Sequence, residues 1–262
     1  MLYEFGLQQQ IGKITAIEMS AFYKDIRDLL ALQSVRYESE KYGPSNYAIY
    51  MNKDYGNVKG YTFSFTKRYD PISRTSAFVD YTYQVTEGNS VNSGSFYYNA
   101  LSGEQEEKRI VPLAWDQRHI LNTNLSIGDP RNWNMGIISK LSSGWPYTPN
   151  IPNANYVPQP NSGRKPWQWR IDMRVHKNFK IRNFNYLFFM KIYNLLDRRN
   201  ERYVFNDTGR AGYTYVYQST QETQGFKNHY GETGVHEWSE YQIRPQYYTS
   251  PRSINIGFSL DF

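Results

Sequence analysis

The side chains of this sequence that could do chemistry are few and widely spaced. The four histidines are His119, His176, His229 and His236, and only the last two share a segment, seven residues apart. That spacing does not match the ligand spacings of zinc sites, so solvated loop histidines are a better interpretation than a metal site. The sequence has no cysteine, which excludes thiolate metal sites and disulfide bridges. We therefore predict no metal and no cofactor.

Two serine–glycine pairs and one glycine-rich segment could suggest catalysis or phosphate binding. Neither Ser143–Gly144 nor Ser162–Gly163 belongs to a Gly-x-Ser-x-Gly sequence, so both predict turns rather than a nucleophile. Residues 209–212 read Gly-Arg-Ala-Gly but lack the Lys-Ser/Thr pair and the following helix of a phosphate-binding loop. No catalytic residue is predicted, and the protein is not expected to be an enzyme.

Aromatic residues crowd the longest polar segment, residues 197–250. Rigid aromatic rings can stack on sugars or flat chelates at a small entropic cost, so this segment could form a ligand platform. The alternative is an ordinary aromatic-rich outer loop. The possible ligand contacts are Tyr213, Tyr215, Tyr217 and Trp238.

Charged residues alternate with apolar ones in the segment 167–176. Arg170, Asp172 and Arg174 lie on one side of an extended chain, opposite a row that runs from Trp167 to Val175. An arginine facing lipid at the middle of a bilayer costs roughly 2–4 kcal/mol, so this side is expected to line a wet lumen. The row could guide an anionic substrate or contact another part of the protein, or it could be a general polar lining.

The same period of two recurs along the whole chain and predicts an all-β protein. The last strand is the clearest, because Ile254, Ile256, Phe258, Leu260 and Phe262 alternate with small or polar residues. This row resembles the signal by which the barrel-assembly machinery captures outer-membrane proteins. The nine expected strands cover residues 3–8, 16–23, 61–66, 77–85, 121–127, 133–137, 167–176, 186–192 and 252–262.

Composition agrees with a membrane β-barrel rather than a helical membrane protein. Aromatic residues make up 17% of the chain, yet only 39% of residues are hydrophobic, and no run of about 18 apolar residues exists. In a barrel only every second strand residue meets lipid, so the mean hydropathy stays low. The net charge of +6 comes from scattered basic residues, which gives no indication of nucleic-acid binding.

The expected connections alternate between short and long. Short turns are expected near Gly12, Asp70, Asp129 and Asn183, and long polar connections at 29–57, 87–116, 143–165 and 197–250. This is the pattern of outer-membrane barrels, in which short turns face the periplasm and long loops face outside.

The strand count and the start of the sequence predict an incomplete barrel. With nine antiparallel strands, the first and last run in the same direction, whereas bacterial single-chain barrels have even strand numbers. Met1 leads directly into an expected strand, without the features of an export signal. We therefore expect residues 1–262 to be the carboxy-terminal part of a larger barrel.

Several short motifs resemble the carboxy-terminal barrel portion of TonB-dependent outer-membrane receptors, in the same order and over essentially the whole chain. Leu196 stands where the family usually has an aromatic residue. The motifs are Tyr3-Glu4-Phe5-Gly6-Leu7, the strand from Ala21 to Leu29, Asn57-Val58-Lys59-Gly60-Tyr61, Trp115-Asp116-Gln117-Arg118-His119, Ser143-Gly144-Trp145-Pro146-Tyr147-Thr148-Pro149, Tyr193-Asn194-Leu195-Leu196-Asp197 and Pro251-Arg252.

The resemblance implies a segment of a 22-strand barrel whose plug domain and early strands are absent from this sequence. It implies uptake of a scarce nutrient, such as a metal chelate or a glycan, across the bacterial outer membrane. The implied partners are outer-membrane lipid, the barrel-assembly machinery, the missing amino-terminal barrel and plug, and the TonB complex through the plug only. The alternatives are an outer-membrane barrel enzyme and a soluble β-sandwich binding module.

Overall fold

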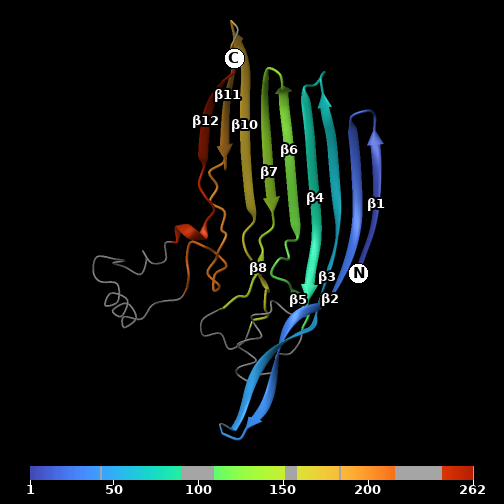
Figure 1. Ribbon diagram of the computed structural model, residues 1–262, viewed down its shortest axis with the longest axis vertical. Helices are drawn as coiled ribbons and strands as arrows, with labels where there is room; N and C mark the ends of the chain where they lie inside the picture. Colours follow the sequence, from blue (N-terminus) through green and yellow to red (C-terminus); the bar gives the residue numbers. More distant parts are fainter. Residues whose placement is uncertain (42, 90–108, 151–157, 183, 216–243, 262) are drawn as a thin grey trace, which may run out of the picture.

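The protein folds into one large antiparallel sheet (Figure 1). The computed structural model describes residues 1–262 except 42, 90–108, 151–157, 183, 216–243 and 262. Consecutive long strands pair side by side, as in a series of hairpins. They are β1 (Leu2–Ile11), β2 (Thr15–Ser39), β3 (Gly43–Asp70), β4 (Thr75–Gly88), β6 (His119–Asp129), β7 (Trp133–Ser142), β10 (Gln168–Ile181), β11 (Phe184–Tyr193) and β12 (Ser253–Asp261).

Four short elements lie in the long connections. Strand β5 (Val111–Pro112) pairs with the end of β4, and β8 (Pro146–Tyr147) pairs with β9 (Gly163–Arg164) in a separate small sheet. The 3-10 helix η1 (Pro245–Tyr247) precedes β12. The described part of the chain contains no helix with the length and hydropathy needed to span a bilayer.

The prediction of about nine antiparallel strands is confirmed, and the sheet is open. Strands β1 and β12 form its two edges, and because every neighbouring pair is antiparallel they run in the same direction. A direct pairing of these two edges would therefore be parallel, unlike every other pairing in the sheet.

One side of the sheet, here the apolar face, has hydrophobic side chains on all nine long strands. Directly paired residues point to the same side of a sheet, so the register assigns each residue to a face. One row of paired residues crosses five strands, from Leu125 through Ile137, Met173 and Ile192 to Ile254. At the two edges the apolar face is open, with Phe5 70% and Ile256 67% exposed.

The opposite side, here the polar face, has mainly hydroxyl, amide and charged groups. The row next to the apolar one contains Ser126, Gly136, Arg174, Lys191 and Asn255. Apolar residues also occur on this face; Ile138, for example, lies there and is 58% exposed. The expected contrast between the two faces therefore holds along the strands but is not complete.

Aromatic residues form a belt on the apolar face near the long connections. The rings of Tyr61 and Tyr83 are stacked with centroids 5.3 Å apart, and those of His119 and Trp167 are stacked at 5.5 Å. His119 is the first residue of β6, so this histidine lies at a strand end.

A second aromatic belt lies on the apolar face near the short turns. Phe179 stacks on Tyr186 with 5.3 Å between ring centroids, and Phe258 lies 5.6 Å from Tyr186. Ten residues separate Trp169 from Phe179 along β10. At about 3.3 Å per residue this is roughly 33 Å of strand, or about 25 Å of height for a strand tilted by about 40°.

The connection predicted for residues 29–57 is wrong, because this segment is a β-hairpin. Strands β2 and β3 continue well beyond the other strands and cross one another below the sheet (Figure 1). A register shift follows Asp28, whose φ is +60°, and Gly43 follows the tip with φ +72°. The extension lies beyond the apolar face. The two strands can therefore pair there without the alternation of apolar and polar residues that is seen in the other strands.

The four short turns are confirmed, and they all lie at one end of the sheet, here the short-turn rim. They join β1 to β2, β3 to β4, β6 to β7 and β10 to β11. The other predicted connections, at 87–116, 143–165 and 197–250, lie at the opposite end, here the long-connection rim. Their central parts are outside the described residues.

Gly60 is a position where the sheet has no room for a side chain. A Cβ atom there would collide with the backbone carbonyl oxygen of Tyr83 and lie 2.9 Å from the Phe22 ring, whereas no atom lies within 4 Å of a Cβ placed on Gly136. We predict that Gly60→Ala destabilises the protein by about 1–3 kcal/mol, the usual cost of overpacking. The matched Gly136→Ala variant should unfold at nearly the wild-type temperature in detergent. Equal unfolding temperatures for both variants would contradict the described register.

Candidate functional site

The three candidate lumen residues lie on the polar face of β10, but only two of them are joined. The Nε of Arg170 donates to Oδ1 of Asp172 at 2.8 Å, and the same oxygen accepts the backbone N–H of Asn194 at 2.8 Å. Arg174 instead lies opposite Gly136 on one neighbouring strand and Lys191 on the other. Asp172 therefore pairs with Arg170 and not with Arg174.

The candidate insertion row lies on the apolar face of the edge strand β12. Ile254, Ile256, Phe258 and Leu260 are directly paired with apolar or aromatic residues of β11 and are all exposed. Phe262, the fifth residue of this row, lies outside the described residues. The row thus continues the apolar face to the edge of the sheet.

Two of the four candidate ligand contacts can be placed, at the long-connection rim. Tyr213 and Tyr215 are exposed, and their rings meet edge to face with centroids 5.8 Å apart. The hydroxyl of Thr208 donates to the carbonyl of Tyr213 at 2.7 Å, and Asp207 accepts the backbone N–H of Tyr215. Tyr217 and Trp238 lie outside the described residues.

A buried carboxylate fixes the segment beneath these tyrosines. Glu201 accepts two guanidinium donors of Arg210, at 2.7 and 3.0 Å, and the backbone N–H of Ala211 at 2.6 Å. This pairing raises the pKa of Arg210. The Gly-Arg-Ala-Gly segment does not form an anion cradle, because a carboxylate of the protein already occupies the Ala211 N–H.

Tyr147 supports the same segment from the small sheet. Its ring lies directly against Gly209, where φ is +68°, so any larger residue there would clash with the ring and be strained. Burial of Tyr147, and secondarily the nearby charge of Asp207, raises the pKa of the phenol. A phenol is already neutral near pH 7 at its ordinary pKa, so the shift leaves its charge unchanged and Tyr147 acts here through packing against Gly209.

Cations and aromatic rings form a second surface at the long-connection rim. The guanidinium of Arg244 lies 5.3 Å from the ring centre of Tyr247 and 5.5 Å from that of Phe205. The ammonium of Lys165 lies 5.9 Å from the ring centre of Tyr203, and burial lowers the pKa of this lysine. Such a surface suits anionic or aromatic ligands.

Asp116 holds the connection between β4 and β6 against the small sheet, a role the sequence did not reveal. It is 0% exposed and accepts the backbone N–H of Thr86 at 2.9 Å, Nε of Arg118 at 3.2 Å and a guanidinium N–H of Arg164. The only sequence signal was the Asp-Gln-Arg-His motif, which suggests a family but not a contact between residues far apart in the chain.

Asn194 and Asn200 fix the start of the last long connection. The amide of Asn200 donates to the carbonyl of Trp169 and its oxygen accepts the N–H of the same residue, both at 2.9 Å, so it pairs with the backbone like a strand. Asn194 adopts φ +54° and donates to the carbonyls of Arg198 and Ser250. Buried asparagines thus replace strand pairing where the chain leaves the sheet.

The remaining candidates form no catalytic group. Ser143 Oγ accepts the backbone N–H of His119 at 3.0 Å, while Nδ1 of His119 lies 2.9 Å from the hydroxyl of Tyr81. His176 lies within β10 on the polar face, and His229 and His236 lie outside the described residues. Within the described ranges, no three His, Asp or Glu residues are grouped as metal ligands.

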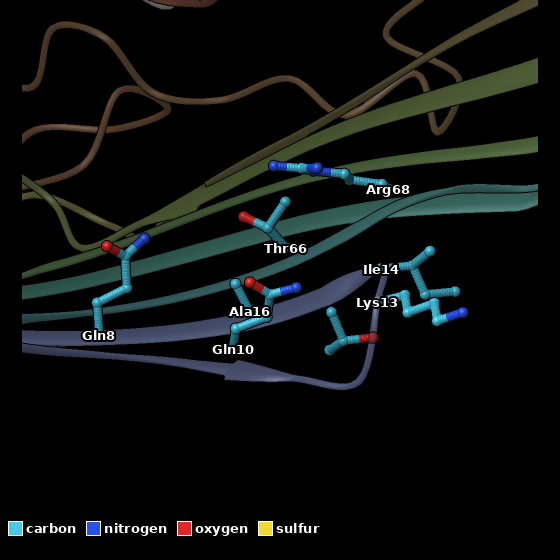
Figure 2. A pocket seen from close by; sticks show the side chains of 8 residues that line it. Gln8, Gln10, Lys13, Ile14, Ala16, Thr66 and Arg68 are labelled. Atoms are coloured by element: carbon cyan, nitrogen blue, oxygen red, sulfur yellow. The ribbon is translucent and has the colours of Figure 1, made fainter.

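A cavity of about 340 Å³ opens on the polar face at the short-turn rim (Figure 2). Its lining residues are mainly amide, hydroxyl and cationic, with two apolar side chains and no carboxylate, which is a polar lining rather than a reaction site. The lining residues are Gln8, Gln10, Lys13, Ile14, Thr15, Ala16, Thr66 and Arg68.

Comparison with solved structures identifies the fold. The chain is similar to the outer membrane transporter YddB from Escherichia coli, with a TM-score of 0.55, 16% sequence identity, and coverage of 76% of this chain and 29% of that one. A further similar structure is the ferric-catecholate import receptor Fiu from E. coli, with a TM-score of 0.48, 14% identity, and coverage of 80% and 25%. No family model and no curated protein matches the sequence.

The predicted fold class, an all-β antiparallel sheet like part of the YddB structure, is confirmed, and the sheet is not closed. The chain spans only 29% of the length of YddB, so the two proteins share one region of the barrel rather than a complete architecture. The predicted resemblance thus holds at the level of the fold.

Removing the charge of Asp116 should loosen the long-connection rim without unfolding the sheet. In Asp116→Asn the new amide group faces guanidinium donors, and unsatisfied partners of this kind cost about 1–3 kcal/mol. We predict faster hydrogen exchange at the Thr86 amide and faster proteolysis of residues 109–118. In the control Asp25→Asn, which breaks an ion pair with the exposed Arg27, both rates should stay unchanged. Unchanged exchange in Asp116→Asn would show that the rim does not depend on this carboxylate.

Proposed function

We propose that residues 1–262 form the carboxy-terminal part of the barrel of a TonB-dependent receptor in the bacterial outer membrane. In this proposal the complete receptor takes up a nutrient, such as a metal chelate or a glycan. The likeness of the fold to an outer-membrane transporter supports the class of protein. The sequence motifs support the family, and the nutrient is inferred from the family alone.

The observation that carries this proposal is the apolar face, which is continuous over nine strands and bounded by two aromatic belts. A band of about 25 Å between aromatic girdles is the height expected for the lipid-facing surface of an outer-membrane barrel. In the bilayer no water satisfies the backbone, so strands must pair fully with their neighbours, as the long strands do here. Lipid would cover the hydrophobic side chains of this face, because soluble proteins rarely expose so large an apolar surface to water.

A soluble β-sandwich would need a second layer over the apolar face. Its largest side chains, such as Phe5 and Ile256, are instead among the most exposed of the described residues. The small sheet of β8 and β9 lies at the long-connection rim and has two residues in each strand, so it cannot cover this face. The sandwich alternative is therefore less well supported than the barrel.

A barrel enzyme would need acids, serine and histidine together at a rim. Ser143 and His119 are neighbours there, but the serine is bonded to the histidine backbone and the imidazole to Tyr81. This arrangement leaves no base to activate the serine. We therefore propose a transport role rather than a catalytic one.

The open edges of the sheet indicate which partners the chain needs. Both β1 and β12 present unpaired backbone groups, which cannot face lipid. We propose that the amino-terminal barrel strands of the same receptor close the sheet, and that the plug fills the lumen and provides the only contact with the TonB complex. Barrel-assembly machinery would recognise the apolar row of β12 by strand addition.

The candidate ligand groups then divide between two locations. Arg170, Asp172 and Arg174 would line the lumen on the polar face. Tyr213 and Tyr215 would form part of an outer ligand platform, to which Tyr217 and Trp238 would also belong. The nearby cations and rings at the long-connection rim agree with a ligand that carries negative charge or aromatic rings.

Neighbouring isoleucines on β7 provide a direct test of the membrane assignment. Ile137 is on the apolar face, and Ile138 is on the polar face opposite Asp172. We predict that Ile137→Arg lowers stability in the membrane by about 2–4 kcal/mol and reduces the yield of folded protein in the outer-membrane fraction. Ile138→Arg should insert normally because its charge meets water and Asp172. Equal yields of the two variants, or recovery of the protein without detergent, would contradict the proposal.

The apolar row of β12 can be tested at Phe258, which contacts Phe179 and Tyr186 through their rings. We predict that Phe258→Ser reduces insertion into outer-membrane vesicles by the purified assembly machinery, because the recognised row loses its central ring. Ser259→Ala changes the other face of the same strand and should insert at the wild-type rate. The proposed role of this row is wrong if both variants insert equally fast.

A further inference from the structure

Three lysines lie on the apolar face, where a charge is costly unless it reaches the headgroup region of a bilayer. Register places Lys59 and Lys67 of β3 and Lys177 of β10 there. Among the directly paired residues of the long strands, outside the extension of β2 and β3, this face has no other lysine and no arginine. Lys59 is near the long-connection rim, whereas Lys67 and Lys177 lie three and four residues from the short-turn ends of their strands.

The charges of these lysines are balanced at one rim and not at the other. The ammonium of Lys59 lies 3.9 Å from the carboxylate of Glu87. In the described part of the chain, neither Lys67 nor Lys177 forms an ion pair with a carboxylate. Lys67 donates to hydroxyl groups, and Lys177 donates to the side-chain oxygen of Asn132. Among these three lysines, a positive charge without a carboxylate partner thus occurs at the short-turn rim.

Two hydroxyl groups fix the ammonium of Lys67. Its Nζ donates to Oγ of Ser73 at 2.9 Å and to Oγ1 of Thr75 at 2.6 Å, and the two hydroxyl oxygens lie 2.9 Å apart. Thr75 is paired with Ile127, so it shares the apolar face with Lys67, and Ser73 is exposed in the turn. An ammonium has three hydrogens, so one N–H donor of Lys67 remains for a ligand.

The turn around this ammonium is positively charged. Residues 67–74 contain three lysines or arginines and one carboxylate, that of Asp70. Asp70 accepts the backbone N–H groups of Ile72 and Ser73, both at 3.1 Å, so its oxygens hold the turn. The net charge of the segment favours an anionic ligand over one that carries a cation of its own.

We propose that Lys67, held by Ser73 and Thr75, binds the phosphate of an anionic phospholipid in the periplasmic leaflet of the outer membrane. The inference rests on the proposed function, because a lipid-facing apolar face is needed to bring headgroups to this ammonium. The phosphate would accept the remaining N–H of Lys67 in a charge-assisted hydrogen bond. The acyl chains would lie over Phe65 and Val79, the next paired residues toward the middle of the apolar face.

The position of Lys67 selects a lipid over a ligand in the lumen. This lysine is on the side of the sheet opposite the polar face, so neither a plug nor a solute inside the barrel would reach it. A zwitterionic headgroup would bring its own cation next to the positive turn, so an anionic headgroup fits better. Because Glu87 neutralises Lys59, no equivalent site is expected at the opposite rim.

The test uses the complete receptor, purified from outer membranes and freed of lipid in detergent, with phosphatidylglycerol, phosphatidylcholine of the same acyl chains and inorganic phosphate as probes. Native mass spectrometry measures the affinity for each probe. We expect phosphatidylglycerol to bind about fivefold more tightly than phosphatidylcholine, roughly the effect of one cation near an anionic headgroup. Lys67→Gln can still bond to the two hydroxyls but lacks the charge, so it should remove this preference. Lys59→Gln, on the same strand and face but at the other rim, should keep it.

Chemical labelling of the wild-type protein gives a second readout that does not depend on the folding of a variant. Phosphatidylglycerol in nanodiscs should slow acetylation of Lys67 relative to Lys59, and phosphatidylcholine should not. The proposal is overturned if Lys67→Gln retains the preference, if the two lipids bind equally well, or if Lys67 is not protected. Inorganic phosphate that binds as tightly as phosphatidylglycerol would show a site for free anions instead of a lipid site. Failure of the membrane assignment would appear separately, in the outer-membrane yields of the Ile137 and Ile138 variants.

Discussion

Full pairing of backbone N–H and C=O groups between neighbouring strands is the constraint on which the rest of this structure depends. In the proposed membrane setting these groups would have no water to bind, and in the structure each long strand is paired with its neighbours while the connections lie at the two rims. The side chains are then free to differ between the faces. In that setting the row from Leu125 to Ile254 would face lipid and the row from Ser126 to Asn255 would face water. Within the described chain, this requirement is unmet at the edges β1 and β12 and along the extension of β2 and β3, which pair only with each other there.

At the long-connection rim the chain no longer forms regular strand pairs. Hydrogen bonds from buried polar side chains hold it in place there. Asp116 binds one backbone N–H and two arginines, Glu201 binds an arginine and one backbone N–H, and Asn200 pairs with the backbone of Trp169. Asp116 and Asn200 join segments that are distant in sequence, whereas Glu201 closes a loop within the last long connection. Such contacts fix the base of a long connection while Tyr213 and Tyr215 stay exposed above it.

Alternation along the sequence was sufficient to assign the faces of β10 and β12, because a period of two follows directly from strand geometry. It failed for residues 29–57, where β2 and β3 extend beyond the lipid-facing region and pairing no longer requires an apolar side. It also missed Asp116 and Glu201, whose roles depend on partners brought together by folding. The alternation also could not show that Asp172 pairs with Arg170 rather than with Arg174. The two arginines are equally spaced from Asp172 in the sequence, so side-chain rotamers and the neighbouring strands decide between them.

The separation of the two faces explains how a repulsive arrangement can persist on the polar one. Insertion and strand pairing depend on the backbone and on the apolar face. The repulsion between Arg174 and Lys191, which lie opposite one another, is therefore small compared with the free energy of pairing and insertion. The register thus tolerates two cations opposite one another at this point of the polar face, while the residues on either side of them stay paired.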